Sequence, residues 1–492
     1  MKMRLFQFCF LVNIVISIQA QNQINNWFFG DSLMMNFVGS TITANQIEAP
    51  NLLPIQEASA SISDHDGNLL FYTDGKYVWN RNNEVMPNGC CLDIDKYWDF
   101  ASSVSQGVII LQRPGYENEY VIAILSEAGF SYNIIDISLD SEYGDVVIKN
   151  EVLISNDLTE QMHAVKHANG RDWWVLVHEQ LNDPDSSALF YKILLSPDTI
   201  QVSSQEAGIK REGNHLGQMV FSPNGERLAY ADKNGLEIFY FDRCTGGLEE
   251  MYFIPIEEIA EDNLYGCAFS SDGNKLFVTS IVYDNYSILF QYCFNCNDPF
   301  PETKKLIYEL IVEYYMLYPK YSFGQLQLGP DGKIYIAVGP TILPSDDFSE
   351  FTTNLSVIKS PNVEIACDVD TNSISLDGRR TILGLPNFPN YSLGALTGSG
   401  CDTLTATYSI ENNNTFSIYP NPAKTFINIT SHLTSYAYTK AEIYNTAGAK
   451  VKEVLLNSPV QEISIETLPC GIYALCIKQK ENAVFSRSFV KE

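Results

Sequence analysis

Short stretches of alternating apolar and polar residues recur along most of the chain, each beginning at a tight turn. Asn-Gly and Asp-Gly pairs favour the two-residue hairpin turn, in which both central residues take positive φ. Period-two alternation after such a turn predicts a β-hairpin. Five copies read SISDHDGNLLFYTDG, AVKHANGRDWWVLVHE, MVFSPNGERLAYADKNG, CAFSSDGNKLFVTS and LQLGPDGKIYIAVG, with turn glycines Gly67, Gly170, Gly225, Gly273 and Gly332.

The hairpins follow one another at intervals of about 50 residues, once a sixth one, VIILQRPGYENEYVIAIL around Gly115, is included. Further strand-like runs follow some of them, such as LEIFYFDR (236–243) and NLSVIKS (354–360). A repeated four-stranded unit of this length is typical of a β-propeller. The N-terminal segments NWFFG and LMMNF could pair with LGLPNFPNY (383–391) to close the ring, so the sequence favours seven blades over six.

Several phrases also resemble those of secreted bacterial β-propellers of the YVTN/WD-like type, over roughly residues 26–395. They are NWFFG, GNLLFYTDGKYVWNRNNEVMPNG, NGRDWWVLVHE, FDRCTG, YGCAFSSDG and LGLPNFPNY. The resemblance implies an all-β fold and an extracellular compartment for residues 21–396. It implies no activity, because one fold of this kind supports many unrelated functions.

The N-terminus has the order of a secretory signal peptide. Lys2 and Arg4 precede an apolar run over 5–18, and the small residue Ala20 follows. We therefore expect cleavage after 1–20. The run is too short and too polar for a membrane anchor, and no later stretch of the sequence is apolar enough to span a bilayer.

The charge excludes some classes of partner. The full chain carries a formal charge of -28, and removal of 1–20 takes away two basic residues and no acidic one, which leaves -30. Such a surface repels phosphate backbones and anionic lipids, so we expect neither nucleic-acid nor membrane-surface binding.

The motif DHDGN offers three side chains to a cation, but the spacing is wrong for calcium. A calcium loop that began with Asp64, Asp66 and Asn68 would need glycine at its sixth place and glutamate at its twelfth, where Leu69 and Gly75 stand. We interpret the motif as a hairpin turn.

Three histidines lie close together in MHAVKHANGRDWWVLVH. A turn at Asn169-Gly170 would place His163 opposite Leu176 and leave His163, His167 and His178 on one face. His163 and His167 would then be roughly 13 Å apart, too far for one zinc ion. The sequence therefore predicts structural histidines between blades, and no metal or cofactor site.

No nucleophile elbow, phosphate loop or zinc-protease helix is present, and no catalytic residue can be assigned. The first hypothesis is a binding or scaffold module for an extracellular protein or glycan. An enzyme acting on polysaccharide and a structural part of an adhesion or gliding apparatus are the alternatives. Four tryptophans could stack on sugars or seal the blades: Trp79, Trp98, Trp173 and Trp174.

The cysteines allow disulfides in an oxidising compartment. Cys293 and Cys296 can form one across a turn in QYCFNCNDP. Cys90 and Cys91 should project in opposite directions in an extended chain, which makes them poor partners for each other.

Other pairings are limited by distance or stay open. Cys470 and Cys476 would lie roughly 20 Å apart along a regular strand, beyond the reach of a disulfide. The possible partners of Cys244 are Cys267, Cys367 and Cys401.

The composition changes near the C-terminus. Residues 397–415 are rich in Gly, Ser, Thr and Asn, which is typical of a linker. Short alternating runs then fill 416–492, which predicts a small β-sandwich of immunoglobulin-like type. Pro420 and Pro422 cannot donate ladder hydrogen bonds, so the first strand should end there or run along an edge.

This last segment resembles the type A C-terminal sorting domain of type IX secretion. The pattern contains a YPNP start, an IYNTAG hairpin over 443–448, an LPxGIY strand and a final FVK strand. Asn445 and Cys470 depart from it, where Asp and Ala are common. The resemblance implies Sec export, then translocation by the type IX machinery to the cell surface or beyond. The motif residues are Tyr419, Pro420, Asn421, Pro422, Gly448, Leu468, Pro469, Gly471, Tyr473 and Lys491.

Overall fold

The computed structural model divides the chain into two compact units, 1–402 and 403–492, which are considered one at a time. The boundary falls inside the expected linker. The signal peptide lies outside the described residues. These are 22–92, 103–126, 128–181, 186–211, 216–259, 263–281, 286–315, 318–340, 348–364, 367–402, 416–431, 439–445, 450–479 and 482–491.

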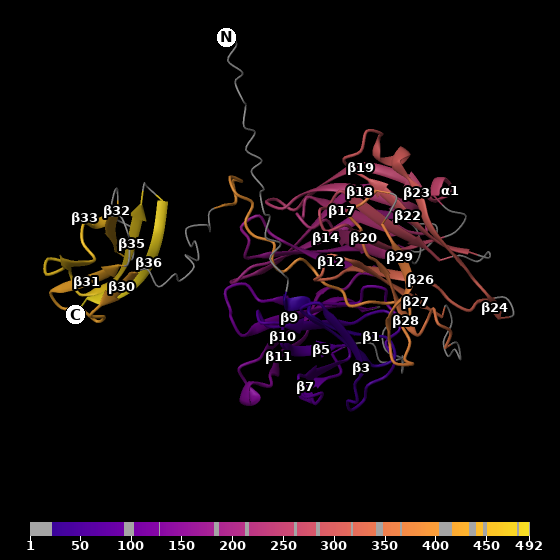
Figure 1. Cartoon of the computed structure of the whole chain (residues 1–492), viewed down its shortest axis with the longest axis horizontal. Coiled ribbons are helices and arrows are strands. Elements are labelled where there is room, and N and C mark those ends of the chain that lie inside the picture. The colour runs from indigo at the N-terminus through magenta and orange to yellow at the C-terminus, as the bar shows by residue number, and fades with distance from the viewer. Residues whose placement is uncertain are drawn as a thin grey trace, which may run out of the picture. The chain divides into compact units, whose positions relative to one another are not determined.

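The described part of the first unit is nearly all β-structure and forms a series of antiparallel sheets in chain order (Figure 1). The first sheet has three strands, β1 (Asn26–Phe29), β2 (Leu33–Val38) and β3 (Thr41–Gln46). Six sheets have four strands each: β4 (Ala60–Ser63), β5 (Leu69–Thr73), β6 (Tyr77–Asn80) and β7 (Val85–Cys90); β8 (Val108–Gln112), β9 (Glu119–Ser126), β10 (Gly129–Asp136) and β11 (Asp145–Ile154); β12 (Leu158–Lys166), β13 (Trp173–Glu179), β14 (Ser187–Leu195) and β15 (Ile200–Arg211); β16 (Gln218–Phe221), β17 (Arg227–Asp232), β18 (Gly235–Asp242) and β19 (Gly247–Pro255); β20 (Leu264–Phe269), β21 (Lys275–Ser280), β22 (Tyr286–Cys293) and β23 (Lys305–Ile311); β26 (Ser322–Leu328), β27 (Ile334–Gly339), β28 (Asn354–Ile358) and β29 (Val369–Ser375).

Short elements also occur before, within and between these sheets. They are the two-stranded β24 (Tyr314–Tyr315) and β25 (Tyr318–Pro319), the helix α1 (Ile256–Ile259), and the 3-10 turns η1 (Asn22–Ile24), η2 (Asp140–Glu142) and η3 (Phe300–Thr303). Of the helices in the described residues, none has the length and apolar character needed to cross a membrane.

The first strands of successive sheets are neighbours in space. β1 contacts β4, β4 contacts β8, and the contacts continue through β12, β16, β20 and β26. The two ends of the series also meet, because Trp27 in β1 packs edge-on against Tyr335 in β27, with ring centroids 5.2 Å apart. Figure 1 shows the indigo N-terminal strands beside the orange β27 and β28.

The predicted hairpins are present, but their turn type differs from the expectation. Only the glycine of each turn has positive φ, for example 90° at Gly67 and 73° at Gly225. In the first turn the Gly67 amide donates to the Asp64 carbonyl, and the Asp64 amide donates to the Asn68 carbonyl. The prediction of a two-residue turn is therefore wrong. Each turn is a longer one that ends in a left-handed glycine, which is typical of a type I turn with a bulge.

The register of the histidine hairpin was predicted correctly. His163 lies opposite Leu176, and Ala164 lies opposite Val175. Because a one-residue slip would turn every side chain to the other face, this register places His163 toward the next sheet.

The predicted pairing of 383–391 with the N-terminal strands, which would have completed a seventh four-stranded blade, is not formed. Within the described residues the first sheet has only the three N-terminal strands, and 383–391 forms no ladder with them. This segment contains Pro386 and Pro389, which cannot donate to a ladder. It makes hydrogen bonds to the first strands of other sheets instead.

The second unit has two antiparallel sheets around one apolar core. One contains β30 (Phe416–Tyr419), β31 (Phe426–Ser431) and β34 (Val460–Ser464), and the other β33 (Lys450–Leu455), β32 (Thr439–Tyr444), β35 (Gly471–Gln479) and β36 (Asn482–Lys491). β30 is an edge strand and ends at Tyr419, immediately before Pro420, as expected for a proline that cannot donate.

Candidate functional site

A C-terminal segment of the first unit, residues 383–396, runs along the first strands of several sheets. We call it the central segment. Asn387 carries much of this contact, because its amide nitrogen donates to the Ser59 carbonyl at 3.0 Å and its Nδ2 donates to the Met162 carbonyl at 2.9 Å. Tyr391 donates its hydroxyl to the Ile110 carbonyl at 2.6 Å. One irregular segment thus joins the sheets that begin with β4, β8 and β12.

Buried glutamines extend this network. The Gln325 side chain accepts from the Leu385 amide at 2.9 Å and donates to the Ser105 carbonyl. Gln106 accepts from the Met219 amide at 2.7 Å, and its Nε2 donates to the Met219 carbonyl at 3.0 Å. Each amide side chain has both a donor and an acceptor, so it can satisfy a carbonyl and an N–H group on different sheets.

A cavity of about 680 Å³ lies where the central segment meets the ends of four first strands. Its walls come from the ends of β12, β16, β20 and β26 and from the turns that follow the last three. The central segment and Ile24 of η1 supply the rest of the wall. The aromatic and proline side chains in the lining are Phe221, Pro223, Phe269, Pro330, Phe388 and Pro389.

The two titratable groups of the cavity lining, His163 and Asp331, already have partners. His163 is buried and accepts a hydrogen bond at Nδ1 from the Phe221 amide at 3.4 Å. Burial lowers the pKa of His163 to about 4, so the ring is neutral at physiological pH. Asp331 accepts from the Tyr335 hydroxyl at 3.0 Å and pairs with Lys333 at 2.8 Å. The cavity therefore presents a largely neutral surface.

A buried carboxylate lies near the opposite ends of the first strands. Glu57 accepts from the Tyr265 hydroxyl and from the Ser103 hydroxyl at 3.2 Å. Burial, assisted by repulsion from Glu160, raises the pKa of Glu57 to about 7. Nothing in the sequence pattern pointed to this group, because Glu57 and Tyr265 are far apart in the chain.

The three histidines singled out by the sequence bind different groups. His163 packs on Phe221, and His178 packs on Phe190 and Tyr230, with centroid distances of 5.9, 4.7 and 5.9 Å. His167 lies beyond the end of β12, and its Nε2 is 3.0 Å from the Cys244 carbonyl. Each ring therefore fills a place between sheets.

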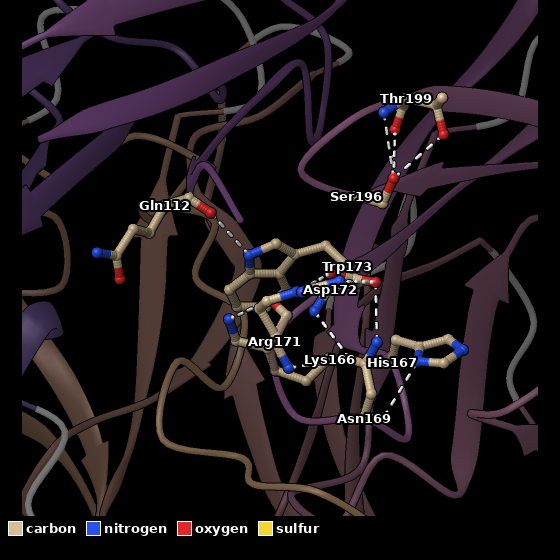
Figure 2. A network of polar contacts seen from close by, with 9 residues as sticks. All are labelled: Gln112, Lys166, His167, Asn169, Arg171, Asp172, Trp173, Ser196 and Thr199. Carbon is tan, nitrogen blue, oxygen red and sulfur yellow. Dashed lines mark hydrogen bonds and ion pairs between the residues drawn. The ribbon is translucent and has the colours of Figure 1, made fainter. Parts of the chain in front are cut away.

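The turn after His167 is held by its own polar side chains, as Figure 2 shows. Asp172 accepts from Asn169 Nδ2 at 2.8 Å and from Arg171 Nε at 2.7 Å. Lys166 is buried here, with its Nζ 3.8 Å from the centre of the Trp173 ring and 3.1 Å from the Arg171 carbonyl. Burial lowers the pKa of Lys166 to about 7, although Asp172 acts in the opposite direction.

The tryptophans that could have stacked on sugars lie inside the sheets. Trp79, Trp173 and Trp174 are at most 6% exposed, and their Nε1 groups donate to backbone carbonyls at 2.9 to 3.0 Å. Trp98 lies outside the described residues. The three described rings therefore seal the structure and present no face to a ligand.

The structure pairs the cysteines in two disulfides. Cys293 pairs with Cys296, and Cys244 pairs with Cys401, each with a Cα–Cα distance of 5.7 Å. The second of these connects the chain just after the central segment to the β18–β19 turn. Of the alternatives left open for Cys244, the structure selects Cys401, while Cys267 and Cys367 are buried free thiols.

The YPNP and FVK parts of the C-terminal motif meet in the second unit. Asn421 Oδ1 accepts from the Val490 amide at 2.9 Å, and the Ala423 amide donates to the Val490 carbonyl at 2.8 Å. Pro420 and Pro422 flank Asn421 and follow Tyr419, which is 46% exposed. The start of this unit is thereby attached to β36.

The LPxGIY part is attached to the same strand. Tyr473 stacks on Phe489 with ring centroids 5.7 Å apart, and its hydroxyl donates to the Pro469 carbonyl at 2.9 Å. Gly471 pairs with Lys491, and Leu468 packs against the core. Gly448 lies outside the described residues.

Comparison with known families agrees with this motif. Residues 417–492 match the family described as "Secretion system C-terminal sorting domain". The protein is therefore exported through type IX secretion to the cell surface or the extracellular space. The sorting domain accounts for the interaction with the type IX machinery that the sequence predicted.

Two of the similar solved structures are distant in sequence. A candidate 6-phosphogluconolactonase from Bacteroides uniformis is 12% identical, with a TM-score of 0.45, over 72% of this chain and 98% of that chain. PorZ, an essential surface component of the type IX secretion system of Porphyromonas gingivalis, is 12% identical, with a TM-score of 0.36, over 96% of this chain and 59% of that chain. No curated protein sequence matches the chain significantly.

Proposed function

We propose that residues 21–396 form a seven-bladed β-propeller that binds a segment of an extracellular protein at the cell surface. The seven consecutive sheets support this architecture, since their first strands are neighbours and the first sheet meets the last. In a propeller the first strands line the central channel. The central segment then lies inside this channel and replaces a fourth strand as the closure of the ring.

The observation that carries the binding function is the cavity beside the central segment. Its volume of about 680 Å³ suits a bound side chain cluster or a short peptide. Aromatic and proline side chains supply apolar area, while Ser222, Ser271, Asn390 and Ser392 add polar groups to the lining. This mixture fits an uncharged, partly apolar protein segment.

Two features favour binding over polysaccharide hydrolysis. Glycoside hydrolysis uses a pair of carboxyl groups that flank the substrate. In the cavity lining, Asp331 already binds Lys333 and Tyr335. Glu57 lies elsewhere, buried near the opposite ends of the first strands, so these two carboxyl groups do not flank a common substrate position. Trp79, Trp173 and Trp174 are also buried, so these three rings offer no stacking face to a sugar.

Export completes the proposed organisation. Residues 1–20 would direct Sec export, residues 397–415 would act as a linker, and the sorting domain would direct passage through the outer membrane. The propeller would then reach its partner on the cell surface.

A substitution at the cavity edge tests this function. Ser392 is exposed and belongs to the lining, so Ser392→Arg would place a long cation at the opening. The protein recovered from the cell surface should capture a surface protein that the S392R variant captures at least about tenfold less. Ser204→Arg, on the exposed edge strand β15, is the matched control and should bind normally. Hydrolysis of a polysaccharide that one carboxylate substitution abolishes would contradict the proposal.

A further inference from the structure

Two adjacent thiols, those of Cys90 and Cys91, meet at the end of β7. Their Sγ atoms are 2.9 Å apart, and both residues are exposed. Cys91 has a φ of 59°, so the chain turns at this residue instead of continuing as an extended strand. The expectation that the two side chains project in opposite directions is therefore wrong, and the turn is the physical reason.

The backbone on both sides of this pair is fixed to the neighbouring strand. Cys90 pairs with Tyr77 in β6, and the Leu92 amide donates to the Lys76 carbonyl at 3.1 Å. Leu92 is fully buried, which anchors the chain just beyond the pair. Cys91 is consequently an extra residue between two anchored ones, as in a β-bulge.

The next sheet holds the two cysteine carbonyls. From β11, Lys149 Nζ donates to the Cys90 carbonyl, and Asn150 Nδ2 donates to the Cys91 carbonyl at 3.1 Å. The turn that brings the sulfurs together is thus supported from β6 and from β11. Hydrogen bonds from two neighbouring strands therefore hold the backbone in the conformation that brings the two thiols together.

We propose that Cys90 and Cys91 form a vicinal disulfide in the exported protein, by exchange with a small or protein disulfide. One cysteine thiolate attacks a disulfide RS–SR and releases RS⁻. The second thiolate attacks the sulfur of the first cysteine, which breaks the mixed disulfide and releases a second RS⁻. The two cysteines lose two electrons and two protons, and the disulfide RS–SR is reduced to two RSH.

This bond differs from the other two disulfides in how easily it is reduced. Adjacent Cα atoms are about 3.8 Å apart, below the range of roughly 4.4 to 6.8 Å that disulfides prefer. Cys244–Cys401 and Cys293–Cys296 have Cα–Cα distances of 5.7 Å, within that range. The pair of Cys90 and Cys91 is therefore a reversible redox site on the surface, and the other two disulfides are structural.

Thiol labelling with mass spectrometry tests this assignment. The chain with its C-terminal unit is exported to a bacterial periplasm, blocked with N-ethylmaleimide without reductant, and cut with trypsin. The peptide 82–96 contains both cysteines and no other. We expect it to carry no label and to be about 2 Da lighter than the dithiol form. Cys470, a free and exposed cysteine, is the control that should be labelled.

Graded reduction gives the second measurement. Peptide 82–96 should gain two labels at a dithiothreitol concentration at least about tenfold below the one that opens Cys244–Cys401. Two labels on the untreated peptide that persist after incubation with oxidised glutathione would overturn the proposal. Pairing of either cysteine with a different cysteine would also overturn it. Cys91→Ser should leave a labelled Cys90, and its thermal unfolding shows whether the variant folds.

Discussion

Asn387 joins strand β12 to the residue just before strand β4, which lies far from it in the sequence. Its Nδ2 donates to the carbonyl of Met162, 2.9 Å away and 225 positions earlier, and its backbone amide donates to the carbonyl of Ser59. Gln106 also approaches the Asn387 side chain, at 3.5 Å. The side chain is buried, so each hydrogen bond it loses would leave a polar group without water.

Asn387→Ala is therefore expected to lower the free energy of unfolding by about 1–3 kcal/mol. The loss would come from the Met162 carbonyl, which keeps its burial and loses its donor. Thermal and denaturant unfolding measure the change. Asn118→Ala, at an exposed position, is the matched control and should change stability by less than about 0.5 kcal/mol. Equal effects of the two substitutions would contradict the role given to the central segment.

Glycines in the same segment provide an independent test. A Cβ added at Gly384 would meet the backbone of Glu57 at 1.9 Å, whereas a Cβ at Gly394 would have no atom within 4 Å. Gly384→Ala should thus cost about 1–3 kcal/mol, because backbone cannot move aside as a side chain can. Gly394→Ala should be close to neutral. Thermal unfolding midpoints of the two variants, measured under the same conditions, test this difference. If Gly384→Ala left the midpoint unchanged, the central segment would not lie against Glu57.

The carboxyl group of Glu57 should make stability fall as pH rises. Its pKa is raised to about 7 in the folded protein from an ordinary value of 4.5, mainly by burial. Between these values the folded protein keeps a proton that the unfolded chain has lost, so rising pH favours unfolding. The free energy of unfolding, measured from pH 4.5 to 7.5, should decline less in Glu57→Gln than in the wild type, by about 1–3 kcal/mol over the range.

The pH dependence of stability that comes from His163 has the opposite sign, so it must be distinguished from the pH dependence that comes from Glu57. Its pKa is lowered to about 4 from 6.5, so its contribution to stability is lost as pH falls through this interval. The wild type and Glu57→Gln both contain His163. Its contribution therefore cancels when the free energy of unfolding of one is subtracted from that of the other. A pH dependence that Glu57→Gln leaves unchanged would show that Glu57 is ionised in the folded protein at neutral pH.

The hairpins could be predicted from the sequence because their turn residues and alternating apolar positions recur along the chain. The Asn169-Gly170 turn and the alternation after it gave the pairing of His163 with Leu176. The same logic located the other hairpins, although it gave the wrong turn type, since only the glycine of each turn has positive φ.

Irregular contacts could not be predicted in the same way. Asn387 lies between Pro386 and Pro389 in a segment with no periodic pattern, and its partners Ser59 and Met162 are far from it and from each other in the sequence. The cavity and the buried Glu57 depend on that same arrangement. The convergence of Cys90 and Cys91 depends on one left-handed residue, which no alternation pattern reveals.

Deletion of 416–492 should stop export at the outer membrane. The sorting domain carries the motif, and the first unit is compact without it. The truncated protein should accumulate in the periplasm, with at least about a tenfold loss of surface signal after protease shaving of whole cells. Asn421→Ala, which removes the acceptor of the Val490 amide, should lower the stability of the sorting domain by about 1 kcal/mol. Normal display of the truncated chain would contradict the sorting role.

Photo-cross-linking on living cells shows directly whether the cavity holds a segment of another protein. A photoreactive phenylalanine analogue replaces Ser392 in one strain and Ser204 on β15 in another. If the cavity binds an extracellular protein segment, position 392 should give a discrete cross-linked protein that position 204 does not give. No cross-link at position 392, or the same products at both positions, would show that the cavity does not bind such a segment.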